Sequence, residues 1–599
     1  MGTASGINTR RYHGLLVAAV EPPAKRMVLL ATVDAFVQTD ANSIGISANQ
    51  YPGAIYPEGY HYLKSFCVDR EAVWRMNPSG VDIERRLYMH PGQNACTMRY
   101  KNLGDSAVLL TLRPLVSHKL HHENFYEQPG YPQQMSFPRR STVVSHDGVD
   151  LYLLHPGAQR LPIQGWYYRF EHARESERGL APRDDLFCPC ELRYELLPGE
   201  EAVLVASTES CEPQSPPDTA EESSAHLGIA LRDAASKFFV QTEARTSIIA
   251  GYPWFTDWGR DTMISIPGLC LHTGRVAEAR RILRDYASQC RDGLIPNRFV
   301  EDNSTPDYNT VDATLWCVNS IYKTLKAEWD AEFANDMWPF LEEVFAMHMQ
   351  GTHFGIKVDP LDGLLSQGEP GVQLTWMDAK IGEWVVTPRH GKPVEINGLW
   401  VNACRVMEWL AEKLGVAAEA YKEAAEKAES NFEPKFWHEV RGHYLDTVDP
   451  SDASMRPNQL IAMALPFGPA KGERARRALD CVSQELLTPL GLRTLGVTEP
   501  GYHGRFQGPL PELDAAYHQG TVWPWLLGPY VSALVRLTGD KREAKRILRE
   551  ARQMLHEYGL GGIAECYDGD EPQGPGGCPY QAWSVAEILR AWVEDAGGD

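Results

Sequence analysis

The 599-residue sequence contains no long hydrophobic run. Its first apolar stretch, residues 15–20, is too short for the core of a secretory signal, and no later stretch approaches the ~20 residues that cross a membrane. The sequence therefore predicts neither a signal peptide nor a transmembrane helix. We expect a soluble cytoplasmic protein that does not bind membranes.

Paired cysteines and an excess of basic charge are also missing. The twelve cysteines are scattered, and the closest two, Cys188 and Cys190, have a single residue between them, so they cannot form a CxxC motif. We expect free thiols in a reducing compartment. With 58 Lys and Arg against 79 Asp and Glu, the net charge of −21 disfavours nucleic acid and favours a neutral or cationic partner.

The N-terminal third has the pattern of a β-domain. A hydrophobic content of 43% allows at least two domains with large cores. Up to residue 208, short alternating or β-branched runs are broken by Gly, Asn, Asp and Pro, for example at residues 26–39 and 201–209. This spacing predicts an antiparallel β-sandwich over residues 1–208. Residues 209–224, rich in Pro, Ser and acidic residues, are expected to be a linker.

The remaining sequence, residues 225–599, has apolar residues at helical spacing. The pattern predicts about a dozen helices in adjacent antiparallel pairs, among them residues 311–329, 397–415 and 581–595. Such pairs can close into a ring of six hairpins, an all-α (α/α)6 barrel, or form an open solenoid, and we favour the closed ring. Alternate loops of a closed ring emerge at one mouth, where six Trp- and Gly-rich segments would meet.

One of these segments, GYPWFTDWGRD at residues 251–261, places aromatic rings beside charged groups. A ring offers an apolar face to the C–H face of a pyranose, while Asp and Arg exchange hydrogen bonds with vicinal hydroxyls. Carboxylates recur beside aromatics in TWMDAKIGEW and ECYDGD, and HQGTVWPW adds further aromatics, a pattern that favours a saccharide pocket. The alternative is a helix-capping salt-bridge cluster beside core tryptophans.

Two loop carboxyls are candidates for catalysis. Glycosidic bonds are cleaved by one carboxyl group that protonates the leaving oxygen and another that activates water or attacks the anomeric carbon. The acid must keep its proton near neutral pH, which apolar surroundings favour. Asp378 follows Trp376 and Met377, and we predict it as the general acid. We predict Glu565 as the base in a wetter, polar setting, with rivals Asp568, Asp570 and Glu571.

Long motifs throughout the chain carry a resemblance to a known family. They include SGINTRRYHGLLVAAVEPP, AGYPWFTDWGRDTMISIPGL, YNTVDATLW, QLTWMDAKIGEW and GPLPELDAAYHQGTVWPW. These motifs resemble those of the glycogen debranching enzyme family, in its prokaryotic amylo-α-1,6-glucosidase form. The resemblance implies an N-terminal β-sandwich, a C-terminal (α/α)6 barrel, and inverting hydrolysis of α-1,6-linked glucose at the branch points of glycogen.

The resemblance also implies roles for individual residues. Asp378 matches the acid and Glu565 the expected base, and inversion requires their carboxyl groups to lie ~6.5–9.5 Å apart. No metal or cofactor is required, because the two carboxyls supply the proton transfers. The residues expected to bind a branched α-glucan are Trp254, Asp257, Trp258, Arg260, Asp261, Asn309, Asp312, Trp376, Lys380, His518, Gln519 and Trp523. A structural role is an equal alternative for Asn309, Asp312, Lys380, His518, Gln519, Trp523 and a further candidate, Glu395.

The sequence departs from the family pattern in two respects. Family members usually carry residues upstream of SGINTRRYHGLL, so we expect this chain to begin late, with an edge strand of the sandwich missing. The strand-rich part, about 208 residues without alternating helices, is too small for a (β/α)8 barrel of ~250 residues. We therefore predict the glucosidase half of a two-activity debranching enzyme.

Three other functions remain open. An exo-α-glucosidase or trehalase-like hydrolase could use the same barrel. A phosphorylase would need phosphate-binding donors near Glu565, which ECYDGDEPQGPGG lacks. A non-catalytic glucan-binding protein would explain the tryptophans but not Asp378 and Glu565. The sequence assigns no oligomeric state, and we interpret NTRRYHGLL as a buried structural corner.

Overall fold

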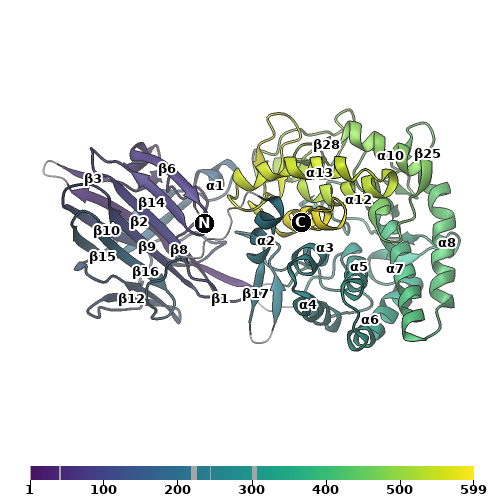
Figure 1. The fold of residues 1–599 in the computed structure, drawn as a ribbon, viewed down its shortest axis with the longest axis horizontal. Helices are drawn as coiled ribbons and strands as arrows, with labels where there is room; N and C mark the ends of the chain where they lie inside the picture. Colours follow the sequence, from purple (N-terminus) through teal and green to yellow (C-terminus); the bar gives the residue numbers. More distant parts are fainter. Residues whose placement is uncertain (1, 39–41, 217–225, 243–244, 300–305, 599) are drawn as a thin grey trace. The chain divides into compact units, whose positions relative to one another are not determined.

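The computed structural model describes residues 2–38, 42–216, 226–242, 245–299 and 306–598 (Figure 1). The chain divides into two compact units, residues 1–221 and 222–599, which we describe separately. The predicted β-sandwich lies in the first unit and the predicted barrel in the second. Residues 217–224 of the predicted linker lie outside the described residues.

Two large antiparallel sheets form most of the first unit, which also contains a two-stranded sheet of β4 Ala48–Tyr51 and β5 Ala54–Glu58. One large sheet has the strand order β1-β2-β10-β15-β14, with β3 beside β2, and the other has the order β11-β12-β13-β16-β9-β8-β7-β6. The strands of the first sheet are β1 Leu16–Glu21, β2 Lys25–Gln38, β3 Ser43–Gly45, β10 Val108–Leu120, β14 Gln159–Glu171 and β15 Arg183–Leu196. Those of the second are β6 Leu63–Val68, β7 Ala72–Met76, β8 Ile83–Met89, β9 Ala95–Asn102, β11 Gln134–Ser136, β12 Ser141–His146, β13 Val149–Leu154 and β16 Glu201–Ser207.

A shared apolar core holds these sheets face to face. Alternate residues of each strand point to one face of the sheet, and Leu110 and Leu112 of β10 are fully buried in the same cluster as Met98 of β9 and Leu204 of β16. The predicted antiparallel sandwich is therefore confirmed. The NTRRYHGLL motif is part of this unit, where the Asn8 side chain donates to the Ala31 carbonyl at 3.0 Å.

Six inner helices of the described second unit form a closed ring. They are α3 Gly259–Leu269, α5 Asp312–Ala327, α7 Val394–Leu414, α9 Gln459–Ala464, α12 Leu527–Thr538 and α14 Ala582–Glu594. Each contacts the next, and α14 contacts α3, so the ring closes and the predicted (α/α)6 barrel is confirmed. The outer helices are α2 Leu227–Ser236, α4 Val276–Ser288, α6 Ala331–Gln350, α8 Glu419–Phe436, α10 Gly472–Glu485 and α13 Lys541–Glu550.

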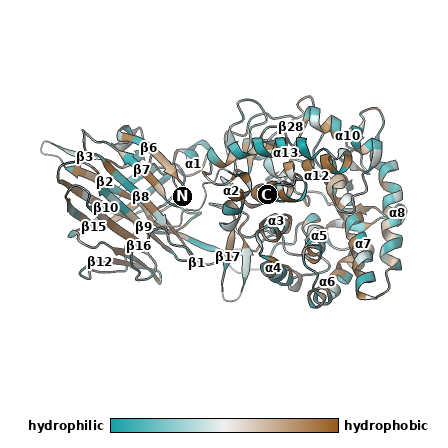
Figure 2. Cartoon of the chain, viewed as in Figure 1, coloured by the Kyte–Doolittle hydropathy of each residue, from teal (hydrophilic) through white to brown (hydrophobic). Residues whose placement is uncertain are grey.

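Burial separates the inner from the outer helices. Every residue of α3 is buried, whereas α8 buries one face through Tyr421, Ala425, Ala428, Phe432 and Phe436. Figure 2 shows the corresponding alternation of hydrophilic and hydrophobic residues along α8. A helix with one apolar stripe can cover a core. Helix α3 also buries Arg260 and Asp261, whose charged groups are hydrogen-bonded to Asp312 and Gln581.

Close packing closes the ring between α3 and α14. A Cβ atom at Gly268 of α3 would lie 1.9 Å from the carbonyl oxygen of Ala586 on α14. The absence of a side chain at this position therefore lets the first and last inner helices approach one another. Helix α11, Leu510–Ala516, is an addition that the sequence pattern did not predict.

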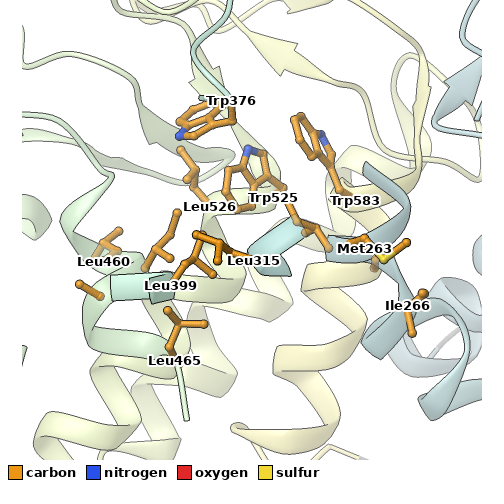
Figure 3. Packing of buried hydrophobic residues seen from close by; sticks show 14 of the residues in the cluster. Met263, Ile266, Leu315, Trp376, Leu399, Leu460, Leu465, Trp525, Leu526 and Trp583 are labelled. Atoms are coloured by element: carbon orange, nitrogen blue, oxygen red, sulfur yellow. The ribbon is translucent and has the colours of Figure 1, made fainter. Parts of the chain in front are cut away.

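Tryptophan side chains cover one end of the barrel core. Figure 3 shows Trp376, Trp525 and Trp583 above aliphatic residues of the inner helices. The Trp525 ring stacks on Trp583 at 5.2 Å and meets Trp376 edge-on, also at 5.2 Å. These rings form an apolar floor at the end of the barrel where the N-termini of the inner helices lie.

Two further findings concern membrane-spanning helices and cysteines. None of the helices in the described residues combines the length and the apolar character needed to cross a bilayer. All twelve cysteines lie in the described residues, and all are free. The cysteines are therefore unpaired, as the sequence predicts.

Candidate active site

A cavity of about 250 Å³ lies on the tryptophan floor of the barrel. Most of its walls are loops that precede the inner helices, so residues distant in sequence meet there. The lining residues are Phe255, Trp258, Arg260, Asp261, Asn297, Asn309, Gln373, Trp376, Asp378, Tyr517, His518, Trp523, Glu565 and Trp583. Both predicted catalytic carboxyls are among them.

The cavity contains nine of the fourteen predicted site residues. Besides Asp378 and Glu565, these are Trp258, Arg260, Asp261, Asn309, Trp376, His518 and Trp523. The five that do not line it are Trp254, Asp257, Asp312, Lys380 and Gln519. Sequence reasoning missed Phe255, Asn297, Gln373, Tyr517 and Trp583. Phe255, Gln373 and Tyr517 lie inside motifs that it had selected, and Trp583 lies in the predicted helix over residues 581–595.

An arginine links Asp378 to the barrel wall. Arg260, at the start of α3, donates from Nη1 to Oδ2 of Asp378 at 2.8 Å and from Nε to both carboxyl oxygens of Asp312 at 2.9 Å. Burial raises the pKa of Asp378, and the Arg260 charge opposes this rise. Asp312 pairs with the same guanidinium, and its negative charge also raises the pKa of Asp378. The Asp378 side chain remains 29% exposed and is accessible to a ligand.

Glu565 is held by two hydrogen-bond donors. Its Oε1 accepts from the Tyr517 hydroxyl, and its Oε2 accepts from the backbone N–H of Cys578 at 2.8 Å. Burial and, to a smaller extent, the Asp378 charge raise the pKa of Glu565 to about 7, against the lowering effect of the two hydrogen bonds. The prediction of a wetter setting was wrong, because the 578 loop covers the carboxyl group and leaves it 3% exposed.

The loop that covers Glu565 requires a glycine. Gly577 has a φ of 61°, a left-handed conformation, and a Cβ there would lie 2.2 Å from Oε2 of Glu565. The three rival carboxyls do not line the cavity. Asp568 accepts from the Phe506 backbone N–H at 2.7 Å, Asp570 accepts from the Tyr502 hydroxyl at 2.9 Å, and Glu571 is exposed.

Asp261 is a third carboxyl group in the same cavity. Burial and the charges of Glu565 and Asp378 together raise its pKa to about 7, against the Arg260 charge. Its Oδ1 accepts from the Gln581 amide at 3.0 Å. All three carboxyl groups line one cavity, and the charge of Asp378 raises the pKa of both Asp261 and Glu565.

Three side chains in the cavity wall have buried polar atoms without a hydrogen-bond partner among the described residues. These atoms are Oδ1 of Asn297, both ring nitrogens of His518 and Nε1 of Trp583. The His518 ring is fully buried, stacks on Trp523 at 5.3 Å, and has a pKa well below its ordinary value because of burial. A neutral imidazole and an amide oxygen can exchange hydrogen bonds with sugar hydroxyls.

The predicted residues outside the cavity have scaffold contacts. Asp257 pairs with Arg245 and accepts from the Ser247 hydroxyl at 2.9 Å. The Lys380 ammonium donates to the Gly371 carbonyl at 3.0 Å. Trp254 meets the Phe255 ring edge-on, and the Gln519 side chain accepts a hydrogen bond from Arg456. Asp312 accepts from Arg260, and the further candidate Glu395 accepts from Arg389.

These observations define the chemical character of the site. Two carboxyl groups with raised pKa values share a cavity lined by tryptophans, at the mouth of an (α/α)6 barrel. Paired carboxyls are the groups that glycoside hydrolases use to cleave glycosidic bonds. Among the residues that the structure describes, no group of three His, Cys, Asp or Glu side chains is placed to hold a metal ion.

The chain belongs to the amylo-α-1,6-glucosidase family. A family model described as amylo-alpha-1,6-glucosidase matches residues 233–590, and one described as glycogen debranching enzyme N terminal matches residues 1–203. The glycogen debranching enzyme of Saccharomyces cerevisiae is 25% identical in an alignment of 463 residues that covers 58% of this chain. This chain spans 30% of the length of that relative.

A solved structure shows the same fold over nearly the whole chain. It is a bacterial glucoamylase complexed with acarbose, with a TM-score of 0.58 and 13% identity, covering 99% of this chain and 93% of its own. A mannosylglycerate hydrolase from Thermus thermophilus is a weaker match, with a TM-score of 0.46 and 17% identity, covering 61% of this chain and 100% of its own.

Proposed function

We propose that this protein hydrolyses the α-1,6-linked glucose at the branch points of glycogen or a limit dextrin, by a single inverting displacement. The observation that carries the proposal is the meeting of Asp378 and Glu565 in one aromatic-lined cavity. The matched family description and the yeast relative support the choice of linkage.

Asp378 is the general acid in this proposal. Arg260 contacts Oδ2 of Asp378, which leaves Oδ1 for the proton. That proton passes to the glycosidic oxygen O6 as the bond from O6 to the anomeric carbon breaks. Burial, which raises the pKa of Asp378, favours the protonated form before the reaction.

Glu565 is the general base. A water molecule attacks the anomeric carbon from the face opposite O6, and Glu565 takes the proton that this water loses. The donors Tyr517 and Cys578 fix the two carboxyl oxygens, and a pKa of about 7 makes Glu565 a stronger base than an ordinary glutamate. The products are β-glucose and a debranched glucan, and proton exchange with water then restores both carboxyl groups.

Parallel assays on four substrates test this function. We expect glucose release from a branched dextrin with a higher kcat/KM than from maltose, isomaltose or trehalose. A preference for trehalose or maltose would overturn the branch-point assignment. Turnover that requires phosphate and yields glucose 1-phosphate would overturn the assignment as a hydrolase.

Tyr517→Phe is expected to change the pH dependence of the reaction. The Tyr517 hydrogen bond lowers the pKa of Glu565, so its loss raises that pKa above about 7. The base works when ionised, and the acidic limb of kcat/KM therefore moves to higher pH. Profiles from pH 5 to pH 9 on branched dextrin measure this shift. An unmoved or lower limb would contradict it.

Tyr502→Phe is the matched control for this experiment. The Tyr502 hydroxyl donates to Asp570 at 2.9 Å, and neither residue lines the cavity. The control therefore removes the same kind of hydrogen bond from a neighbouring loop. We expect its pH profile to match that of the unaltered protein.

A further inference from the structure

The cavity is too small for a branched glucan. Its volume of about 250 Å³ is below the ~300–1,000 Å³ of pockets that enclose a drug-sized ligand. It therefore takes the terminal glucose, and the main chain of the glucan must lie outside it. A surface beside the cavity must hold this main chain if the branch point is to be positioned.

Trp384 is an exposed aromatic beside the catalytic loop. Of the two aromatic side chains in the described second unit that are strongly exposed, Trp329 is 45% exposed and Trp384 is 56% exposed. Trp329 follows the far end of α5, about 25 Å from the cavity end of that helix, and meets Trp409 edge-on at 6.0 Å. The described residues provide no ring contact or hydrogen bond for the Trp384 side chain.

Trp384 belongs to a short hairpin that follows Asp378 in the chain. Strands β22 Lys380–Ile381 and β23 Trp384–Val385 pair with Ile381 opposite Trp384. The hairpin begins two residues after Asp378 and is closed at its base by a 3.1 Å hydrogen bond from Val386 to Ala379. It also contacts α11, the helix that leads to Tyr517. The hairpin that carries Trp384 therefore lies beside the chain segments that supply Asp378 and Tyr517.

The position of the acid determines which part of the substrate lies here. A general acid lies beside the glycosidic oxygen that joins the terminal glucose to the main chain, which is the leaving group. Trp384 does not line the cavity that takes the glucose, and it follows the acid along the same hairpin. We propose that Trp384 is the platform on which a glucose unit of the α-glucan main chain, on the leaving-group side, stacks.

This inference rests on the proposed branch-point hydrolysis, and two substrates separate the two ideas. Trp384→Ala is expected to raise KM for branched dextrin about tenfold, with kcat/KM falling to match. Its kcat/KM for α-glucosyl fluoride, which has no glucan main chain, should stay within about twofold. Trp384→Phe keeps an aromatic face and should recover most of the affinity for branched dextrin.

Trp329→Ala is the matched control, because it removes an exposed tryptophan at the other end of the barrel. We expect Trp329→Ala to leave kcat/KM unchanged for branched dextrin and for α-glucosyl fluoride. If the unaltered protein releases no glucose from branched dextrin, the proposed function fails. If the unaltered protein does release glucose, two results would overturn the assignment of Trp384 and leave the proposed function standing. One is an unchanged KM of Trp384→Ala for branched dextrin, and the other is an equal change in kcat/KM for both substrates.

A binding measurement tests the same surface without turnover. Maltoheptaose, which represents the linear main chain alone, is titrated into two proteins. One carries Asp378→Asn, and the other carries both Asp378→Asn and Trp384→Ala. We expect Trp384→Ala to weaken this binding about tenfold. Equal affinity of the two proteins would overturn the proposed platform.

Discussion

Asp378→Asn is expected to lower kcat on branched dextrin by about 10³-fold or more, because the amide cannot protonate the departing O6. The change is nearly isosteric, its side-chain oxygen can still accept from Arg260, and Asp312 keeps the guanidinium paired. Binding of maltoheptaose should therefore stay within about tenfold of the unaltered protein. Steady-state kinetics and calorimetry measure the two effects.

A substrate with a better leaving group identifies the role of Asp378. Fluoride departs with little need for a proton, so Asp378→Asn should hydrolyse α-glucosyl fluoride within about tenfold of the unaltered rate. Glu383→Gln, on the same hairpin with a side chain that is 99% exposed, is the control and should leave both reactions unchanged. Retained turnover of branched dextrin would disqualify Asp378 as the acid.

Glu565→Gln is expected to abolish turnover of both substrates, with a loss of about 10³-fold or more. Water must lose a proton to Glu565 whichever leaving group departs, so fluoride cannot rescue this variant. The unfolding temperature must be measured alongside, because the amide would face the Tyr517 hydroxyl and the Cys578 N–H that the carboxylate accepts.

Glu571→Gln, an exposed position of the same loop, is the control for Glu565→Gln. We expect it to leave both reactions and the unfolding temperature unchanged. If Glu565→Gln keeps its activity on α-glucosyl fluoride while Asp378→Asn loses it, the acid and base roles are reversed. A folded Glu565→Gln protein that is active on both substrates would exclude Glu565 from the reaction.

Periodic patterns made much of the fold predictable. The long amphipathic runs of α4, α8 and α10 carry one apolar face each, and their order along the chain indicated the paired ring. Strand β14 was not predicted, because register shifts and positive φ values at Gln164 and Arg169 interrupt its alternation. Helix α11 spans seven residues with a proline in its first turn, so it has too few turns for a periodic signal.

The candidate site was only partly predictable. Aromatics beside carboxylates marked the loops that contain Asp378 and Glu565, and both line the cavity. The partner of Arg260 depends on tertiary folding, since Asp312 lies 52 residues further along the chain. The burial of Glu565 has the same origin, because the Cys578 loop that covers it reads as polar and flexible in sequence. Local composition locates a loop but not the atoms that close over it.

The stereochemistry of the first-formed glucose tests the central claim most directly. Proton NMR spectra, recorded as the protein begins to act on branched dextrin and before mutarotation, distinguish the two anomers. One displacement by water between Asp378 and Glu565 predicts that β-glucose appears first. Initial release of α-glucose would mean that configuration is retained, and the proposed pair of acid and base would be contradicted.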